Sequence, residues 1–384
     1  MTTVDEGGIG SSVIAYYTRR LDAGACCGPA PVSLAAADES EAAIPSFGCG
    51  DPLATASIAP GERVLDLGSG AGLDAIRAAV AAGPTGRVIG VDMTPAMVAR
   101  ARSAAARLGL DQVEFREGVI EDLPLPDGGV DLVLSNCVVH LSTDKARVFR
   151  EIERVLAPGG RMRLSDILVH DRHERVPTVA GWCACIDGAV DAATYRRLAR
   201  RAGLIDVAVD PDPPNVAPGE TYSAVVTGAK ADVRVAARDD AAQAEALLTR
   251  SGLPTEGWSD PATRRWVLVE ERRVQGAIGL ELREGEALVR SLAVDVGARG
   301  RGFGGALLVV ALREAALQGA TRVFGLTTSI PEWLGRLGFV ETHRARMPAA
   351  LFASAELQGA CPASARVFEL AIVPRRRTRA GEAA

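Results

Sequence analysis

Short apolar runs alternate with longer alanine-rich stretches between residues 63 and 226. Such runs, bounded by turn residues, are typical of buried strands, and the alanine-rich stretches are typical of helices. We expect strands in the runs Val64–Leu67, Arg87–Val91, Val130–Leu134 and Arg161–Leu164, and in Thr221–Thr227 after a proline-rich break. Strands that alternate with helices in this way predict a parallel α/β sheet.

A second pattern begins at Val233 and runs to about Val373. It predicts a strand, a helix that ends near Ser251, further strands and, after a glycine-rich turn, a long helix. The later strands are Trp266–Glu270, Val274–Leu282 and Leu288–Val294, and the long helix is Gly304–Gln318. We therefore predict two α/β domains, residues 1–230 and 231–374, followed by a basic tail at residues 375–384.

The length and charge of the chain agree with two soluble domains. A chain of 384 residues exceeds what one hydrophobic core usually organises. No apolar stretch approaches the roughly 20 residues that span a bilayer, and the polar, acidic start of the chain does not resemble a signal peptide. We expect a cytoplasmic protein. The net charge of -5 excludes a general affinity for nucleic acid.

The cysteines are distributed unevenly. Six of the seven lie in the first domain: Cys26, Cys27, Cys49, Cys137, Cys183 and Cys185, with Cys361 alone in the second. In a reducing compartment they are expected to be thiols. No pair of Cys-x-x-Cys knuckles is present, which makes a structural zinc site improbable. The cluster calls for a different chemistry.

The segment Val64–Asp74 runs from an apolar strand into a Gly-x-Gly-x-Gly turn and then a helix. Glycines let a ligand approach the backbone closely, and Asp92, at the end of the next strand, is placed to accept hydrogen bonds from ribose hydroxyls. The order resembles that of the class I S-adenosylmethionine methyltransferases. The resemblance implies a cofactor site at Asp66, Gly68, Gly70, Gly72, Asp92, Met93, Ile120, Glu121 and Asn136. A Rossmann domain that binds NAD is the alternative, and Asp66 is equally explained as a structural residue that orients the glycine turn.

Two cysteines in loop-like, glycine-containing segments point to the methyl acceptor. Cys49 lies in Phe47–Pro52, before the first strand, and Cys185 lies in Cys183–Ala189, after the fourth. Two thiolates that meet above a sulfonium suit a soft, thiophilic acceptor. Trivalent arsenic fits, because it binds thiolates and keeps a lone pair that can attack a methyl carbon.

Over nearly all of residues 13–205 the sequence resembles the arsenite methyltransferases. The resemblance is carried by Ala25-Cys26-Cys27, Phe47-Gly48-Cys49-Gly50, Val64–Asp74, Gly90–Thr94, Ser135–Val139, Asp144-Lys145, Arg154–Leu156, Ser165-Asp166 and Cys185–Ala189. It implies that Cys49 and Cys185 bind trivalent arsenic. It also implies that Cys26 or Cys27 forms redox disulfides during turnover, with thioredoxin or glutathione as the thiol reductant.

One departure affects the substrate. Many members of the family have a further arsenic-binding cysteine roughly where Gly219 and Glu220 stand here. Two thiolates, with help from Cys183, favour arsenicals that already carry an organic group. Two alternatives stay open: a small-metabolite C- or O-methyltransferase, and a non-catalytic arsenic-binding sensor. A metal site at His170 and His173 is disfavoured by its spacing.

In the second domain the run Arg299-x-x-Gly302-x-Gly304 stands between a strand and a long helix. Successive backbone amides and the N-terminus of the helix suit a pyrophosphate there. With Leu292–Val294, whose strand edge can pair with a pantetheine arm, this resembles the GNAT acetyltransferases. The resemblance implies an acetyl-CoA site at Leu292, Val294, Arg299, Gly300, Gly302 and Gly304.

Further segments resemble the acetyltransferases encoded beside arsenic-resistance genes, some of which acetylate glutamate analogues that contain arsenic or phosphorus. These segments are Gly252–Gly257, Gly279–Glu281, Arg290–Val294, Leu326–Thr328, Leu337–Phe339, Arg344 with Pro348, and Cys361–Ala365. Glu281 is the candidate base that deprotonates the amine. A structural carboxylate that pairs with Arg290 is the equal alternative. Arg290 and Arg344 are candidates for holding a substrate anion.

Overall fold

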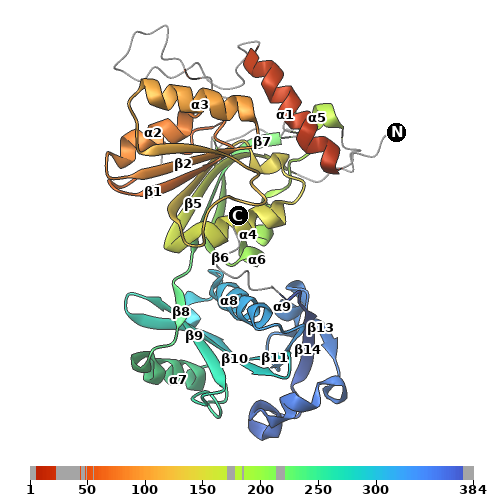
Figure 1. Cartoon of the computed structure of the whole chain (residues 1–384). Helices are drawn as coiled ribbons and strands as arrows, with labels where there is room; N and C mark the ends of the chain where they lie inside the picture. The colour runs from red at the N-terminus through yellow and green to blue at the C-terminus, as the bar shows by residue number, and fades with distance from the viewer. Residues whose placement is uncertain are drawn as a thin grey trace. The chain divides into compact units, whose positions relative to one another are not determined.

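The computed structural model describes residues 6–22, 44, 48, 50–54, 56–170, 178–183, 186–212 and 221–374. Contacts along the chain divide it into two compact units, Met1–Lys230 and Ala231–Ala384 (Figure 1). Each unit contains one seven-stranded sheet. Among the described residues, no helix combines the length and the apolar character needed to cross a membrane.

The sheet of the first unit has the order β3-β2-β1-β4-β5-β7-β6. Neighbours among β1 to β5 are parallel, and β7 is antiparallel to both β5 and β6. The strands are β1 (Arg63–Leu67), β2 (Arg87–Asp92), β3 (Val113–Glu117), β4 (Val130–Asn136), β5 (Leu156–Val169), β6 (Leu204–Pro211) and β7 (Thr221–Lys230). The parallel α/β sheet predicted from the sequence is therefore present, with an antiparallel pair at one edge.

Helices cover both faces of this sheet because side chains alternate across each parallel strand. Val64 packs with α2 (Leu73–Ala82) and α3 (Pro95–Arg107), whereas its neighbour Leu65 packs with α4 (Lys145–Val155) and α6 (Ala192–Ala202). The carboxyl ends of the parallel strands are left open to a ligand, which is the usual place for a site in such a fold.

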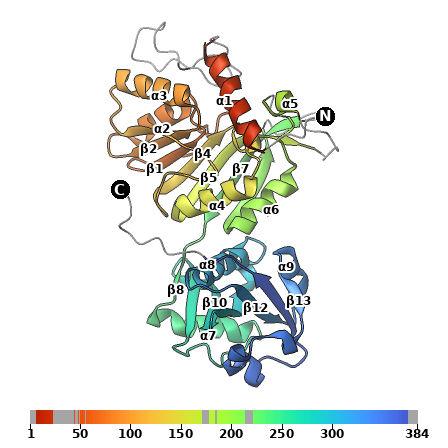
Figure 2. The same cartoon turned by 45° about the vertical axis from the view of Figure 1, so that its right-hand side comes forward.

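Two helices that the sequence did not predict lie beside each other over that open edge (Figures 1 and 2). They are α1 (Glu6–Asp22) and the short α5 (Val179–Cys183). The glycines and serines of α1 have low helix propensity, but its Ile9 and Val13 are buried against Cys183. Tertiary packing therefore outweighs local preference in this helix.

The sheet of the second unit has the order β13-β14-β12-β11-β10-β9-β8. Its strands are β8 (Val233–Val235), β9 (Thr263–Glu270), β10 (Arg273–Arg283), β11 (Glu286–Val294), β12 (Arg322–Thr327), β13 (Val340–Thr342) and β14 (Arg366–Ala371). The principal helices are α7 (Ala241–Arg250) and α8 (Phe303–Leu317), and α9 (Pro331–Arg336) is short. The pair β11–β12 is parallel, and the other neighbouring strands are antiparallel.

Candidate functional site

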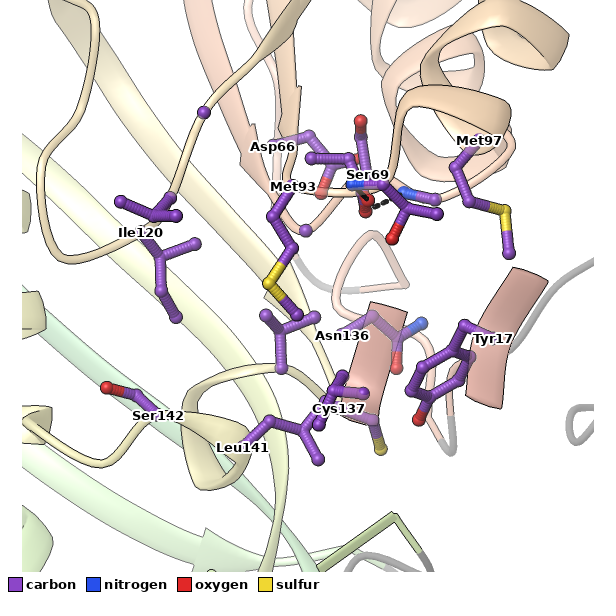
Figure 3. Close-up of a pocket in the computed structure, with 18 of the residues that line it drawn as sticks. Tyr17, Asp66, Ser69, Met93, Met97, Ile120, Asn136, Cys137, Leu141 and Ser142 are labelled. Carbon is purple, nitrogen blue, oxygen red and sulfur yellow. Dashed lines mark hydrogen bonds between the residues drawn. The ribbon is translucent and has the colours of Figure 1, made fainter. Parts of the chain in front are cut away.

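A cavity of about 240 Å³ lies in the first unit, at the carboxyl ends of β1, β2 and β4. We call it the donor pocket. Figure 3 shows Asp66, Met93, Ile120 and Asn136 around it, with Tyr17 of α1 on one side. Eight of the predicted donor-site residues line this pocket: Asp66, Gly68, Gly70, Asp92, Met93, Ile120, Glu121 and Asn136.

The three glycines of the first turn have different tasks. Gly68 and Gly70 line the pocket, with φ of 64° and 51°. Gly72 does not line it: a Cβ there would meet the side chains of Phe115 at 2.8 Å and Ala101 at 2.9 Å. All three adopt left-handed backbone conformations, which glycine allows at least cost. Gly72 therefore serves packing of the turn rather than ligand contact.

Asp92 ties the two loops of the pocket together. One carboxylate oxygen accepts from the Gly70 N–H at 2.9 Å, and the other accepts from the Thr94 N–H at 2.8 Å. Burial raises the pKa of Asp92, and the two backbone donors oppose that rise. The carboxylate lies where the sequence placed a ribose acceptor, and it also holds the glycine turn in shape.

Two further carboxylates lie beside it. Asp66 is 2% exposed, and its Oδ2 has no hydrogen-bond partner among the described residues. Burial, followed by repulsion from Asp74 and Asp92, raises the pKa of Asp66 well above its ordinary value. Burial also raises the pKa of Asp74, which accepts from Asn136 at 2.9 Å and from Arg77 at 3.2 Å. A cationic group beside the unpartnered oxygen of Asp66 would oppose this rise and favour the carboxylate form.

Glu121, which also lines the pocket, is held by a residue that the sequence did not single out. The Ser142 hydroxyl donates to Glu121 Oε1 at 2.5 Å, and both residues line the pocket. Ile120 and Met93 add apolar surface to the pocket. These residues combine apolar side chains with one oriented carboxylate, which suits a nucleobase.

The four thiols predicted to act on arsenic lie outside the described residues: Cys26, Cys27, Cys49 and Cys185. The neighbours of Cys49 are described. Gly48 lines the donor pocket, and the Asn136 amide donates to Gly50 O at 2.8 Å while its Oδ1 accepts from the Gly50 N–H at 3.2 Å. A Cβ on Gly48 would lie 2.2 Å from Asn136 Cγ. The chain on both sides of Cys49 is thus fixed against Asn136.

Two other cysteines of this unit are buried. Cys137 lines the donor pocket just after β4 with φ of 58°, and its N–H donates to Ser165 O at 2.8 Å. Cys183 is 4% exposed among Ile9 and Val13. The apolar surroundings of Cys183 favour a packing role. The ring of His170, which was considered as a metal ligand, stacks on that of Tyr222 with centroids 4.4 Å apart.

In the second unit the predicted phosphate-binding turn precedes α8. Gly300 and Gly302 have φ of 84° and 105°, and Gly302 caps the helix. The first helical bond there is Ala306 N–H to Gly302 O at 3.1 Å, so the preceding amides point outward from the helix end. Arg299 is exposed, and its Nε donates to Val294 O at 3.2 Å. Gly304 lies in the first turn of α8.

The strand before this turn separates from its neighbour. Pairing of β11 with β12 ends at Val289 and Gly325, although β11 continues to Val294, paired on its other edge with β10. A bulge at this point gives Ser291 a φ of 53°. Leu292 and Val294 lie on the stretch that has left β12, as a strand edge that pairs with a pantetheine arm requires.

Glu281 is paired with Arg290, as the alternative that gives it a structural role expects. Arg290 Nη1 donates to Glu281 Oε1 at 2.8 Å, and Ser354 donates to the same oxygen at 2.8 Å. Arg283 pairs with the other oxygen at 3.2 Å. Arg290, with a side chain 0% exposed, also pairs with Glu356 at 3.2 Å. We therefore correct the expectation that Arg290 is available for a substrate anion, because it is buried between carboxylates.

Both units are similar to known protein families. Residues 58–203 match the family model "Methyltransferase domain", and residues 234–339 match the "Acetyltransferase (GNAT) family". The chain joins a methyltransferase domain to a GNAT acetyltransferase domain. The predicted fold class is thereby confirmed for both domains.

The methyltransferase domain has curated relatives. The chain is 55% identical over 122 residues to an arsenite methyltransferase of Halobacterium salinarum, covering 32% of this chain and 31% of that protein. It is 40% identical over 177 residues to one of Aquipseudomonas alcaligenes, covering 44% and 51%. The crystal structure of an arsenic(III) S-adenosylmethionine methyltransferase of Chlamydomonas reinhardtii is 40% identical, with a TM-score of 0.39 over 47% of this chain and 66% of that one. The chain thus spans about half or less of the curated relatives named here.

Proposed function

We propose that the chain is a bifunctional enzyme. Its first domain transfers a methyl group from S-adenosylmethionine to trivalent arsenic bound by Cys49 and Cys185, and its second transfers an acetyl group from acetyl-CoA to an amine. The observation that carries the first activity is the donor pocket, whose wall includes Gly48, which precedes Cys49 in the sequence, and Asn136, which is hydrogen-bonded to Gly50. The similarity to arsenite methyltransferases supports arsenic as the acceptor.

The residues of the donor pocket fit S-adenosylmethionine. Asp92 would accept from the ribose, and Glu121, oriented by Ser142, would accept from the adenine amino group. The unpartnered oxygen of Asp66 would face the cationic end of the cofactor. Bound there, S-adenosylmethionine would supply an electrophilic methyl group.

In this proposal the chain's thiolates hold the acceptor and prepare it for attack. The two sulfurs replace water or thiol ligands on trivalent arsenic and leave its lone pair directed at the methyl carbon. When the carbon–arsenic bond forms, the carbon–sulfur bond of the sulfonium breaks and arsenic is formally oxidised to the pentavalent state. Two thiols are oxidised to a disulfide and their two electrons return arsenic to the trivalent state, after which the reductant reduces the disulfide to the two thiols. We propose Cys26 or Cys27 for this redox step, with thioredoxin or glutathione as the reductant.

For the second domain, the amides that precede Ala306 at the start of α8 would bind the pyrophosphate of acetyl-CoA, and the edge of β11 that has left β12 would hold its pantetheine arm. We propose an amine acceptor, of which amino acids containing arsenic or phosphorus are the first class to test. Glu281 stays our candidate base, but the contacts of Arg290, Ser354 and Arg283 with its carboxylate favour a structural role.

The experiment uses the full chain with S-adenosylmethionine, a thiol reductant and methylarsenite, and mass spectrometry of the products. Cys49→Ser and Cys185→Ser should each reduce methylation by about 100-fold or more, because one sulfur cannot replace a chelating pair. Cys361→Ser, in the other unit, is the matched control and should methylate as the wild type does.

Methylation of methylarsenite that persists in both single variants would show that Cys49 and Cys185 do not bind the arsenic, and a wild type that methylates no trivalent arsenical would favour a small-metabolite methyltransferase. Tight binding of arsenic without product would instead support the arsenic-binding sensor. We expect methylarsenite to be a better substrate than arsenite. A panel of amines with acetyl-CoA, followed by release of free CoA thiol, tests the second activity separately.

A further inference from the structure

The turn after β4 is held by side chains from outside it. Three consecutive carbonyl oxygens accept hydrogen bonds there. Lys145 Nζ donates to His140 O at 3.0 Å and to Ser142 O at 2.8 Å, and Trp182 Nε1 donates to Leu141 O at 2.8 Å. Lys145 is 8% exposed, and its ammonium lies 5.7 Å from the centroid of the Trp182 ring. Asp166 Oδ2 also accepts from the His140 N–H at 2.9 Å, so Lys145 and Asp166 hold this turn, and Trp182 joins α5 to it.

The same turn forms part of the donor pocket. Leu141 and Ser142 line it, and Figure 3 shows both below Ile120 and Met93. Trp182 itself does not line the pocket and belongs to α5. Its indole N–H thus connects a wall of the pocket to a separate segment of the chain.

The segment from Trp182 to Gly188 contains Cys185 in the sequence, and the residues at both of its ends lie against the turn. At one end is Trp182, and at the other is Gly188, where a Cβ would lie 2.1 Å from His140 O and 3.1 Å from Trp182 Cε2. Any larger residue at position 188 would push the segment off the turn.

The residues that follow Cys185 are fixed as well. The Ile186 and Asp187 N–H groups donate to Gly181 O at 2.9 and 3.1 Å, and the Asp187 carboxylate accepts from the Thr178 N–H at 2.7 Å. Ile186 is bonded directly to Cys185. The attachment point of Cys185 is therefore fixed relative to α5, and α5 is fixed to the pocket wall through Trp182.

We propose that Trp182 is a positioning residue for methyl transfer: its hydrogen bond to Leu141 sets the distance between the donor pocket and the segment that carries the acceptor thiol Cys185. The inference rests on the proposed function of Cys185. Transfer needs the reacting atoms about 3–3.5 Å apart and aligned, and a displacement of about 1 Å costs on the order of 100-fold in rate. Tryptophan suits the task because its one polar group is a donor on a rigid ring.

The test compares Trp182→Phe, which keeps an aromatic ring and removes the donor, with the wild-type full chain. We expect kcat for methylation of methylarsenite to fall by about 10-fold or more. The Kd for S-adenosylhomocysteine by calorimetry should stay within about twofold, since Trp182 does not line the pocket and Lys145 and Asp166 still hold the turn that does. Trp266→Phe in β9 of the other unit is the matched control and should leave both values unchanged.

A second measurement does not depend on the identity of the acceptor. Hydrogen–deuterium exchange of residues 183–190 should be at least about fivefold faster in Trp182→Phe, with unchanged exchange in β1 and β4. Wild-type exchange in that peptide, or an unchanged kcat, would overturn the positioning role. If the wild type methylates no trivalent arsenical, the proposed function fails instead, and the exchange result alone then decides whether Trp182 holds the segment.

Discussion

Replacement of Asp92 by alanine should separate cofactor binding from folding in the methyltransferase domain. The carboxylate accepts from the Gly70 and Thr94 N–H groups at 2.9 and 2.8 Å and lines the donor pocket. In our proposal it also accepts from the two ribose hydroxyls of the cofactor. Alanine removes every one of these acceptors and adds no bulk, so the pocket keeps its walls.

The expected loss of affinity follows from the number of bonds removed. A hydrogen bond to a charged acceptor contributes about 1.5 kcal/mol, so two ribose hydroxyls amount to about 3 kcal/mol. That corresponds to a Kd roughly 150-fold higher. The two backbone N–H groups lose a partner as well, which we expect to cost about 1–2 kcal/mol of stability. The domain should therefore still fold at room temperature.

Calorimetry with S-adenosylhomocysteine measures the affinity, and thermal unfolding measures the stability. Asp92→Asn, which keeps one acceptor oxygen, should fall between alanine and wild type. Asp131→Ala is the matched control, since Asp131 is a surface carboxylate paired with Arg63 at 2.6 Å. An Asp92→Ala protein that binds within threefold of wild type would refute the ribose assignment, whereas a protein that no longer folds would show that its bonds to Gly70 and Thr94 dominate.

Two further predictions concern other parts of the chain. Gly302→Val should abolish acetyl transfer while methylation persists, because a φ of 105° disfavours valine and the amides before α8 would turn away from the cofactor. Gly304→Ala should have a milder effect on acetyl transfer, since its Cβ would meet Trp333 only at 3.5 Å; release of CoA is measured for both variants. Asp66→Asn should raise the free energy of unfolding at neutral pH, because the raised pKa of Asp66 makes the folded wild type retain a proton and lose stability as the pH rises above about 3.8. Chemical denaturation at several pH values should therefore show that the free energy of unfolding depends less on pH in the variant than in the wild type.

The sequence was sufficient to predict which residues lie together where their placement depends on backbone geometry, while their roles toward the cofactor stay predictions. Glycines that must adopt positive φ and carboxylates at strand ends recur at fixed spacings, which is why Gly68, Gly70 and Asp92 meet in one pocket as expected. Gly72 belongs to the same motif but faces Phe115, a contact with a residue of a different strand. Spacing alone does not distinguish a glycine needed for a ligand from one needed for packing.

Elements without a strong local pattern were missed. The strand β3 is partly exposed at the edge of the sheet and carries polar residues, and α1 contains glycines that oppose a helix. Ser142 carries no motif, and its bond to Glu121 joins residues 21 positions apart. A serine of this kind becomes recognisable only after the chain has folded.

Arg290 shows how burial changes the interpretation of a charged residue in the acetyltransferase domain. From the sequence, an arginine on a strand beside the glycine-rich turn was a reasonable anion ligand. In the structure, Nη1 is bonded to Glu281, Nη2 to Glu256 O and Glu356, and Nε to Ser291 at 3.4 Å, while Gly257 leaves no room for a Cβ beside the guanidinium.

A buried arginine with two carboxylates is costly to disturb, because removal of one charge leaves another unpaired. The guanidinium of Arg290 is already paired with Glu281 and Glu356, so it is not available to bind an anionic substrate. These side chains instead join β10 and β11 to the loop after α7, through Glu256, and to the segment between β13 and β14, through Ser354 and Glu356. We therefore expect selectivity for the acetyl acceptor to reside in the exposed residues of those two loops, and Arg290 to matter by holding the loops at the point where β11 leaves β12.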